Sequence, residues 1–359
     1  YRTERDPQAV ETGDCRGSFE DGGNHCGCLK KNITLRPGED ARLIFMLGEG
    51  GAQAGRAARD KYTPERFDSD FARLAEFWDE KLGCLQIDTP NEGMNTEINI
   101  WNLYQSEINV MFSRFTSFIE VGGRTGLGYR DTAQDAMMVP HSDPEKCRAR
   151  LVELMRALTR AGYGLHLFEP RWFEPEQKQQ SFKSPTVVPT PDKSQIVHGI
   201  KDACADDALW LVSSVVQYIK ETGELRFADE VITYADGGEG TVYEHMRRIL
   251  DFSAAQVGQN GICKGLRADW NDCLNLGGGE SAMVSFLHYW ALNNFVALAK
   301  RLGRNADAGK YSAVAEKVKA VCESTLWDGE WYIRGITADN RRIGTHNDAE
   351  GRVHMESNT

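Results

Sequence analysis

The chain has 359 residues, of which 41% are hydrophobic and 26% are charged, and this composition is typical of a globular protein rather than a disordered one. Its formal net charge of −11 argues against nucleic acids and anionic membranes as partners, because a polyanion would be repelled. No stretch approaches the roughly 20 consecutive apolar residues that a transmembrane helix needs.

The nine cysteines are scattered along the chain without the spacing of a disulfide framework or a zinc site. Only Cys26 and Cys28 lie close together. We therefore expect free thiols, which persist in the reducing cytoplasm, and no bound metal. The first residues lack the apolar stretch of a signal peptide. Because the sequence begins without Met, we expect a further segment to precede it.

Residues 1 to about 60 are predicted to be strand or loop. Two short β-prone runs, Cys28 to Thr34 and Ala41 to Leu47, are separated by the turn sequence Arg36-Pro-Gly-Glu39. Two or three strands cannot close a sandwich, so residues 1–60 are predicted to be the C-terminal part of a larger β domain.

After Thr63 the apolar residues recur at helical spacing, and residues 61–113 are predicted to be a helical linker. Further helices are predicted at Ile98–Phe112, Pro144–Ala161, Asp206–Thr222, Thr241–Gln256, Ser281–Leu302 and Ala306–Leu326. Long loops separate them, at residues 162–198 and 229–240, and loops of this length are usually functional. The pattern predicts a mainly α fold of helical hairpins, such as an incomplete α/α toroid.

The most informative motif is the octet Arg267-Ala-Asp-Trp-Asn-Asp-Cys-Leu274, which is followed by three glycines at 277–279. Its two aspartates, Asp269 and Asp272, flank the indole of Trp270. Sugar sites need a carboxyl group that donates a proton and an aromatic face for the ring C–H groups. A solvated loop that caps the next helix is the alternative explanation.

A second cluster spans residues 114–141, where four glycines fall within seven residues and Arg114, Arg124 and Arg130 lie on or beside them. Glycines let the backbone approach a ligand closely, and guanidinium groups match oxyanions such as phosphate. Asp131 can accept hydrogen bonds from two neighbouring hydroxyls. Because no P-loop lysine follows, we reject nucleotide binding, whereas surface ion pairs stay an alternative.

Together the two clusters resemble glycoside hydrolase family 94, the inverting glycoside phosphorylases. The matching strings are Gly128-Tyr-Arg-Asp-Thr-Ala-Gln-Asp135 and Ala268-Asp-Trp-Asn-Asp-Cys-Leu-Asn275. The resemblance implies the tail of an N-terminal β-sandwich (1–60), a helical linker (61–113) and an incomplete (α/α)6 catalytic barrel (114–359). Further phosphate and acceptor residues are then expected beyond Thr359.

Within the family, the chitobiose branch is the better match, on the tracts 122–131, 139–144 and 162–168. Cellobiose phosphorylases tend to carry Gly-Phe-Arg-Asp-Ser-Asn-Gln-Asp at the first string and an arginine in place of Thr125. The resemblance therefore implies a hexosyltransferase that converts N,N'-diacetylchitobiose and phosphate to N-acetyl-α-glucosamine 1-phosphate and N-acetylglucosamine. A cellobiose or cellodextrin phosphorylase is the alternative, and an inverting α/α-barrel hydrolase is a further one.

The resemblance also assigns roles to individual residues. Asp272 is the general acid that protonates the glycosidic oxygen, while phosphate attacks the anomeric carbon from the opposite face. An inverting hydrolase needs a second carboxylate about 6.5–9.5 Å away, which a phosphorylase can omit because phosphate is already anionic. The implied substrate-binding residues are Arg114, Arg124, Arg130, Asp131 and Trp270.

No cofactor or metal is implied by the resemblance, since inorganic phosphate is itself a substrate. It implies a disaccharide and phosphate as ligands and a cytoplasmic homodimer for the full-length protein. A carboxyl group that donates a proton near neutral pH needs a pKa above its usual value, and burial beside Trp270 is expected to raise the pKa of Asp272. Asp269 is expected to orient the loop rather than react.

Overall fold

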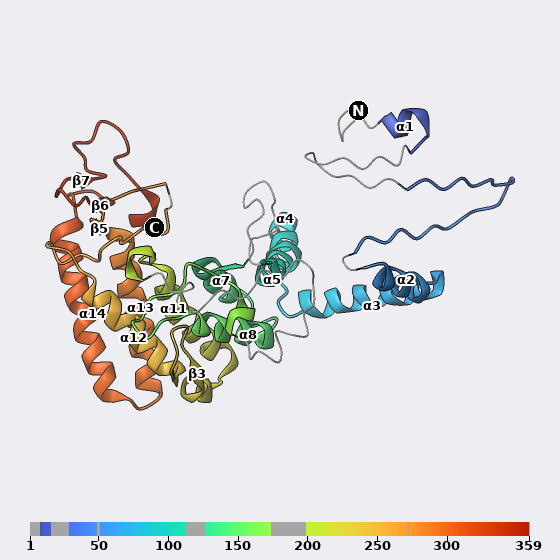
Figure 1. Cartoon of the computed structure of the whole chain (residues 1–359). Helices are drawn as coiled ribbons and strands as arrows, with labels where there is room; N and C mark the ends of the chain where they lie inside the picture. Colours follow the sequence, from blue (N-terminus) through green and yellow to red (C-terminus); the bar gives the residue numbers. More distant parts are fainter. Residues whose placement is uncertain are drawn as a thin grey trace. The chain divides into compact units, whose positions relative to one another are not determined.

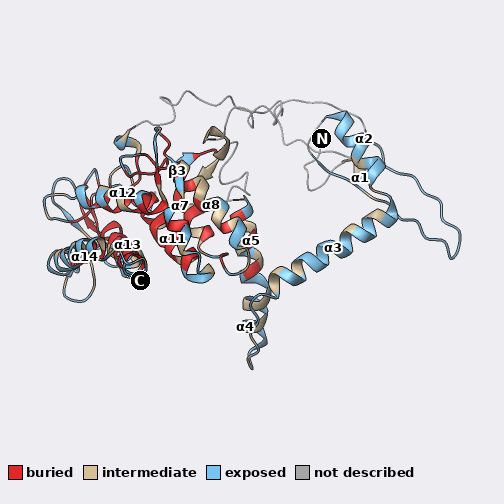
Figure 2. Cartoon of the chain, turned by 90° about the horizontal axis from the view of Figure 1, so that it is seen from below, coloured by how far each residue is buried: buried red, intermediate tan, exposed pale blue. Residues whose placement is uncertain are grey.

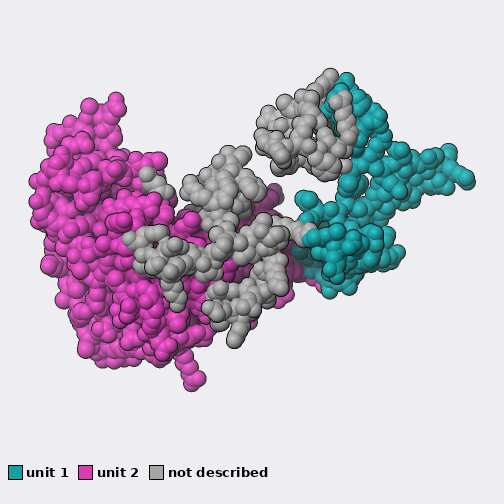
Figure 3. All heavy atoms as spheres, viewed as in Figure 1, with its two compact units in different colours: residues 1–74 teal, residues 75–359 magenta. Residues whose placement is uncertain are grey.

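The computed structural model describes residues 8–15, 29–48, 51–112, 126–173, 199–271 and 273–358. The chain divides into two compact units, residues 1–74 and residues 75–359, which Figure 3 colours separately. Among the described residues, no helix is both long enough and apolar enough to cross a membrane. The predicted limits of the three domains stay predictions.

The first unit contains helices α1 (Gln8–Thr12) and α2 (Ala52–Lys61) and the start of α3 (Pro64–Leu82). The predicted turn is present, with the backbone N of Glu39 donating to the O of Arg36 at 3.0 Å. The two β-prone runs form no strand within the described residues 29–48, so of the predicted strand or loop these residues are loop. These residues are almost all exposed, and two strands alone bury too little apolar surface to be stable.

Helix α2 occupies residues that the sequence analysis assigns to strand or loop. Four of its ten residues are alanine, which has the highest helix propensity, and none of its side chains is buried. Local propensity therefore explains this helix, whereas the prediction rested on the two β-prone runs that precede it. Helix α3 begins at Pro64, within the range predicted to be helical, because proline is well suited to the first turn of a helix.

The second unit is built mainly of helices, and each of the six ranges predicted after residue 97 contains one. Its α-helices and π-helix η1 are α4 (Glu92–Thr96), η1 (Glu97–Asn102), α5 (Leu103–Phe112), α7 (Tyr129–Ala136), α8 (Pro144–Arg156), α11 (Asp207–Thr222), α12 (Val242–Ala255), α13 (Ala282–Arg301) and α14 (Asn305–Leu326). Its 3-10 turns are η2 (Pro170–Phe173), η3 (Ile200–Asp202), η4 (Leu225–Asp229) and η5 (Met355–Ser357).

Helix α11 lies at the centre of this unit and packs against α7, α8, α12 and α13. Buried residues cover most of its circumference, as expected of a helix that has neighbours on several sides. Figure 2 shows the buried residues gathered on these helices. Helices α13 and α14 are joined by three residues and therefore lie antiparallel, side by side (Figure 1).

Three small antiparallel sheets connect the starts of the helices. Strand β1 (Leu127–Gly128) pairs with β2 (Leu167–Phe168), and β3 (Val231–Thr233) pairs with β4 (Glu239–Thr241). Strand β6 (Gly335–Ile336) pairs with both β5 (Glu280–Ser281) and β7 (Arg342–Ile343). Residues 229–240, predicted as a loop, thus contain most of a hairpin. Strands β1, β4 and β5 run directly into α7, α12 and α13, so the sheets hold the N-terminal ends of these helices.

The turn after α8 depends on Gly162, which leads towards strand β2. Its φ is +99°, and a Cβ atom at this position would lie 2.2 Å from the carbonyl O of Arg248 and 2.8 Å from the Cβ of Phe252. Gly223, which ends α11, also has a positive φ of +74°, but a Cβ atom there would meet nothing within 4 Å. A comparison of alanine substitutions at these two glycines therefore separates the effect of backbone strain from the effect of crowding.

We expect Gly223→Ala to lower the free energy of unfolding by about 1 kcal/mol, through backbone strain alone. Gly162→Ala should lower it by about 3 kcal/mol or more, because overpacking adds to the strain. Urea denaturation of the full-length protein, followed by circular dichroism, measures both values. Equal losses for the two variants would contradict the crowding argument.

Candidate active site

Of the predicted site residues, the structure describes Arg130, Asp131 and Trp270. The other three, Arg114, Arg124 and Asp272, lie outside the described residues, so their roles stay predictions. The site is therefore built here from the residues that surround them in sequence and from the partners of those residues.

Part of the glycine-rich cluster is a helix rather than a loop, which corrects the sequence analysis. Arg130 and Asp131 lie in the first turn of α7, whose N-cap is Gly128. A Cβ atom at residue 128 would be 2.7 Å from Asp131 Oδ2, so a larger residue there would require the Asp131 carboxylate to shift. The helix starts here because the glycines end and strand β1 pairs with β2 immediately before it. Arg130 is consequently buried, at 6% exposure.

Arg130 brings the two sequence clusters together. Its Nη1 donates a hydrogen bond of 2.7 Å to the carbonyl O of Asp269, in the octet, and lies 3.4 Å from Asp206 Oδ1. A hydrogen bond from a buried guanidinium group is strengthened by the low local dielectric. Arg130 of the glycine-rich cluster is thus anchored on the backbone of the octet.

The octet is a loop whose conformation depends on the buried carboxylate of Asp269. This carboxylate accepts hydrogen bonds from Arg334 Nη2 at 2.7 Å, from Ser281 Oγ at 2.6 Å and from the backbone N of Asn271 at 3.0 Å. Asp269 is 2% exposed and Arg334 is 0% exposed. A buried charge is tolerated when it is paired and hydrogen-bonded, and both conditions hold here.

Asn271 holds the residues on either side of position 272. Its Oδ1 accepts a hydrogen bond of 3.0 Å from the backbone N of Cys273, and its Nδ2 donates to Glu356. Together with the bond from its own backbone to Asp269, these contacts restrain the backbone on both sides of the predicted acid. Trp270 is 43% exposed, so part of its indole faces solvent, as stacking on a sugar requires.

A third segment, residues 203–207, completes the described part of the site. The backbone N of Ala205 donates to Ala268 O at 2.9 Å, and the backbone N of Arg267 donates to Ala203 O at 3.2 Å. The octet therefore pairs with the residues that precede α11. Among them is Asp206, which the sequence analysis treats only as the start of a helix.

Asp206 is fully buried beside Arg130. Its Oδ2 also accepts a hydrogen bond of 3.0 Å from Trp210 Nε1. Burial, and then the neighbouring Asp207 carboxylate, raise the pKa of Asp206 to about 7, whereas Arg130 opposes the shift. Near neutral pH the Asp206 carboxyl therefore exchanges its proton, and the charge next to Arg130 changes with it.

Three residues of this arrangement escape the sequence analysis: Asp206, Arg334 and Glu356. Two adjacent acids before an apolar helix, with a tryptophan four residues later, are the signal that points to Asp206. Arg334 lies in an ordinary stretch before a short strand, and no local pattern distinguishes it. Only the folding of β6 against β5 brings Arg334 to the octet.

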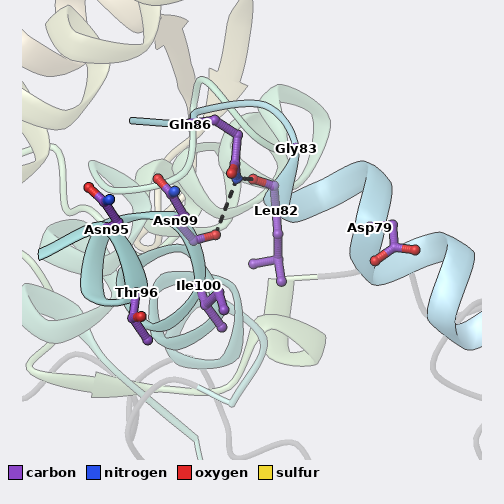
Figure 4. Close-up of a pocket in the computed structure, with 8 residues that line it drawn as sticks. All are labelled: Asp79, Leu82, Gly83, Gln86, Asn95, Thr96, Asn99 and Ile100. Atoms are coloured by element: carbon purple, nitrogen blue, oxygen red, sulfur yellow. Dashed lines mark hydrogen bonds between the residues drawn. The ribbon is translucent and has the colours of Figure 1, made fainter. Parts of the chain in front are cut away.

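A pocket of about 520 Å³ lies elsewhere in this unit, between the end of α3 and the turns of α4 and η1 (Figure 4). Gln86 is one of its lining residues, and Gln86 Nε2 donates to the carbonyl O of Leu82 at 2.7 Å and to that of Asn99 at 3.4 Å. None of the predicted site residues lines this pocket, so it plays no part in the candidate active site.

Helical hairpins whose starts carry a buried arginine beside a loop with acids and an exposed indole have the architecture of an α/α-barrel, carbohydrate-active domain. The chain belongs to the glycosyl hydrolase 94 family. The catalytic domain of the Glycosyl hydrolase 94 superfamily matches residues 77–359, and the Glycosyl hydrolase 94 supersandwich domain matches residues 1–65. The predicted fold class, part of an α/α barrel preceded by the tail of a β-sandwich, is thereby confirmed.

Several characterised proteins are similar to this chain. It is 56% identical over 362 residues to N,N'-diacetylchitobiose phosphorylase from Vibrio proteolyticus, covering 100% of this chain and 45% of that protein. The N,N'-diacetylchitobiose phosphorylase from Vibrio furnissii gives 56% identity with the same two coverages. Solabiose phosphorylase from Paenibacillus borealis is 28% identical, over 98% of this chain and 42% of that protein. The chain spans about half the length of the curated relatives it matches.

We expect Arg334→Met to destabilise the folded protein by about 3–5 kcal/mol, because it leaves the Asp269 carboxylate buried without its charged partner. Arg342→Met, in the exposed strand β7 of the same sheet, should change the stability by less than about 0.5 kcal/mol. Urea denaturation of the two full-length variants measures the difference. A small effect of Arg334→Met would show that Asp269 does not depend on this pair.

Proposed function

We propose that the full-length protein cleaves N,N'-diacetylchitobiose by inverting phosphorolysis and releases N-acetyl-α-glucosamine 1-phosphate and N-acetylglucosamine. The observation that carries this proposal is the hydrogen bond of 2.7 Å from Arg130 to the carbonyl O of Asp269, which joins the arginine cluster to the acid-bearing loop. The proposal is supported by the identity of 56%, over the whole chain, to two proteins with this activity.

In the proposed mechanism, Asp272 protonates the glycosidic oxygen as the leaving sugar departs, and phosphate attacks the anomeric carbon from the opposite face. The hydrogen bonds around Asp269 and Asn271 hold the loop, which fixes the direction of the acid. The exposed face of Trp270 supports the sugar ring. The residues proposed to bind the sugar and phosphate are Arg114, Arg124, Arg130, Asp131 and Trp270.

The environment of Asp206 favours phosphorolysis over hydrolysis. An inverting hydrolase needs a carboxylate that deprotonates a water molecule. Asp206 contacts Arg130, but it is 0% exposed and its two oxygens are engaged by Arg130 and Trp210. Its oxygens are therefore closed to a water molecule that would act as the nucleophile.

The proposed reaction needs no cofactor, because phosphate is the nucleophile and the acid is a side chain. We also propose that the ligands are the disaccharide and phosphate, that the full-length protein is a homodimer, and that it acts in the cytoplasm. The net charge of −11 supports the absence of a nucleic-acid partner. The seven cysteines within the described residues are all free thiols, which agrees with a reducing compartment.

Phosphate dependence is the first test. Incubation of the full-length protein with N,N'-diacetylchitobiose should produce N-acetyl-α-glucosamine 1-phosphate only when phosphate is present, and NMR of the anomeric proton should show the α configuration. Cellobiose under the same conditions should react much more slowly. Cleavage at the same rate in phosphate-free buffer would identify a hydrolase instead. Faster turnover of cellobiose would indicate a cellobiose phosphorylase.

Loss of the general acid is the second test. We expect Asp272→Asn to lower kcat by about 10²–10⁴-fold while the disaccharide still binds, because the amide cannot supply the proton. The matched control is Asp339→Asn, at an exposed turn between β6 and β7, which should leave kcat unchanged. Steady-state kinetics and calorimetric binding to the full-length variants separate the two effects. Wild-type turnover of Asp272→Asn would refute the assignment.

A further inference from the structure

A cluster of three metal-ligand side chains lies next to the candidate active site. His166, Cys204 and Asp207 each offer one ligand atom, and these atoms all lie within 4.8 Å of one another. His166 Nδ1 is 3.1 Å from Asp207 Oδ2. The sequence analysis misses this cluster because His166 is distant from the other two residues in sequence.

We propose that His166, Cys204 and Asp207 form a binding site for a divalent cation of the zinc class, separate from the residues that bind sugar and phosphate. Imidazole nitrogen, thiolate sulfur and carboxylate oxygen are the three ligand types that zinc takes in proteins. Softer thiolate ligands also discriminate against magnesium and calcium, which prefer oxygen. Three protein ligands leave one position of a tetrahedral site open.

The three ligands are held by separate, well-anchored segments. Asp207 is the first residue of α11, and Cys204 pairs with Leu266 in an antiparallel bridge. The carbonyl O of His166 accepts a hydrogen bond of 3.0 Å from the backbone N of Tyr129, at the start of α7. The ligand atoms of tetrahedral zinc, with bonds of about 2.0–2.3 Å, are about 3.2–3.8 Å apart. The cluster therefore reaches this geometry through small side-chain rotations.

Burial and access also fit a metal site. Cys204 is 4% exposed and Asp207 is fully buried, whereas the His166 side chain is 34% exposed and leaves a route from solvent. The hydroxyl of Tyr129 is buried and has no hydrogen-bond partner among the described residues. This unpartnered polar group belongs to the residue whose backbone N donates to His166 O.

The charges of the three ligands also suit a divalent cation. Zn²⁺ with one thiolate and one carboxylate has no net charge, and a neutral complex suits a buried site.

Cobalt(II) substitution tests the site in the full-length protein, after treatment with a chelator and dialysis. Co²⁺ bound to a thiolate gives a ligand-to-metal charge-transfer absorption, which therefore reports Cys204 directly. We expect one equivalent of Co²⁺ per chain to produce this absorption, Zn²⁺ to abolish it by displacement, and excess Mg²⁺ to leave it unchanged. The experiment measures binding and not turnover, so its result is independent of the proposed phosphorolysis.

Matched variants locate the absorption. Cys204→Ser should remove it, and His166→Gln should weaken Co²⁺ binding by about 100-fold or more. The controls are Cys273→Ser, an exposed thiol in the octet, and His346→Gln, a histidine paired with Asp328 at 2.7 Å that belongs to no such cluster among the described residues. Both controls should bind like the wild type. The absence of the absorption in the wild type, or its persistence in folded Cys204→Ser, would overturn the proposal.

Discussion

A carboxylate that is removed from water must find its compensation inside the protein, and the described part of this site is organised around that requirement. Asp269 meets it with a guanidinium group, a hydroxyl and a backbone amide, each contributed by a different part of the chain. Its own carbonyl O then accepts the hydrogen bond from Arg130. One residue thereby connects the octet, helix α7, the start of α13 and strand β6. The fixed conformation of the octet has its physical source in this connection.

The helices of the second unit could be predicted because their apolar residues recur at helical spacing and their starts carry recognisable residues. Two helix starts are marked to within a residue or two, one by Pro144 and the other by the capping box of Thr241 and Glu244. Helix α7 could not be predicted, since its charged, short sequence is stabilised by tertiary burial rather than by local pattern. The β-prone runs before residue 60 form no strand within the described residues for the opposite reason. Their local propensity is high, but a strand also needs neighbouring strands to pair with.

The site divides along a similar line. The octet and the glycine-rich cluster could be found from sequence because unusual residues are concentrated in each, and a family resemblance connects them. Arg334 and Glu356 could not, because their importance arises only from where β6 and the turn η5 are placed by the fold. The cluster of His166, Cys204 and Asp207 is of the same kind. Chemistry that is local in sequence is predictable, whereas chemistry assembled by folding is not.

The burial of Asp269 and Arg334 also has an evolutionary consequence. A substitution at either position alone leaves an isolated charge in the protein interior, so single substitutions at these positions are selected against. Related enzymes that lack one member of this pair must also have replaced the other, and the two positions are expected to covary in an alignment. Correlated change between distant positions can therefore identify supporting residues such as Arg334 that no motif marks.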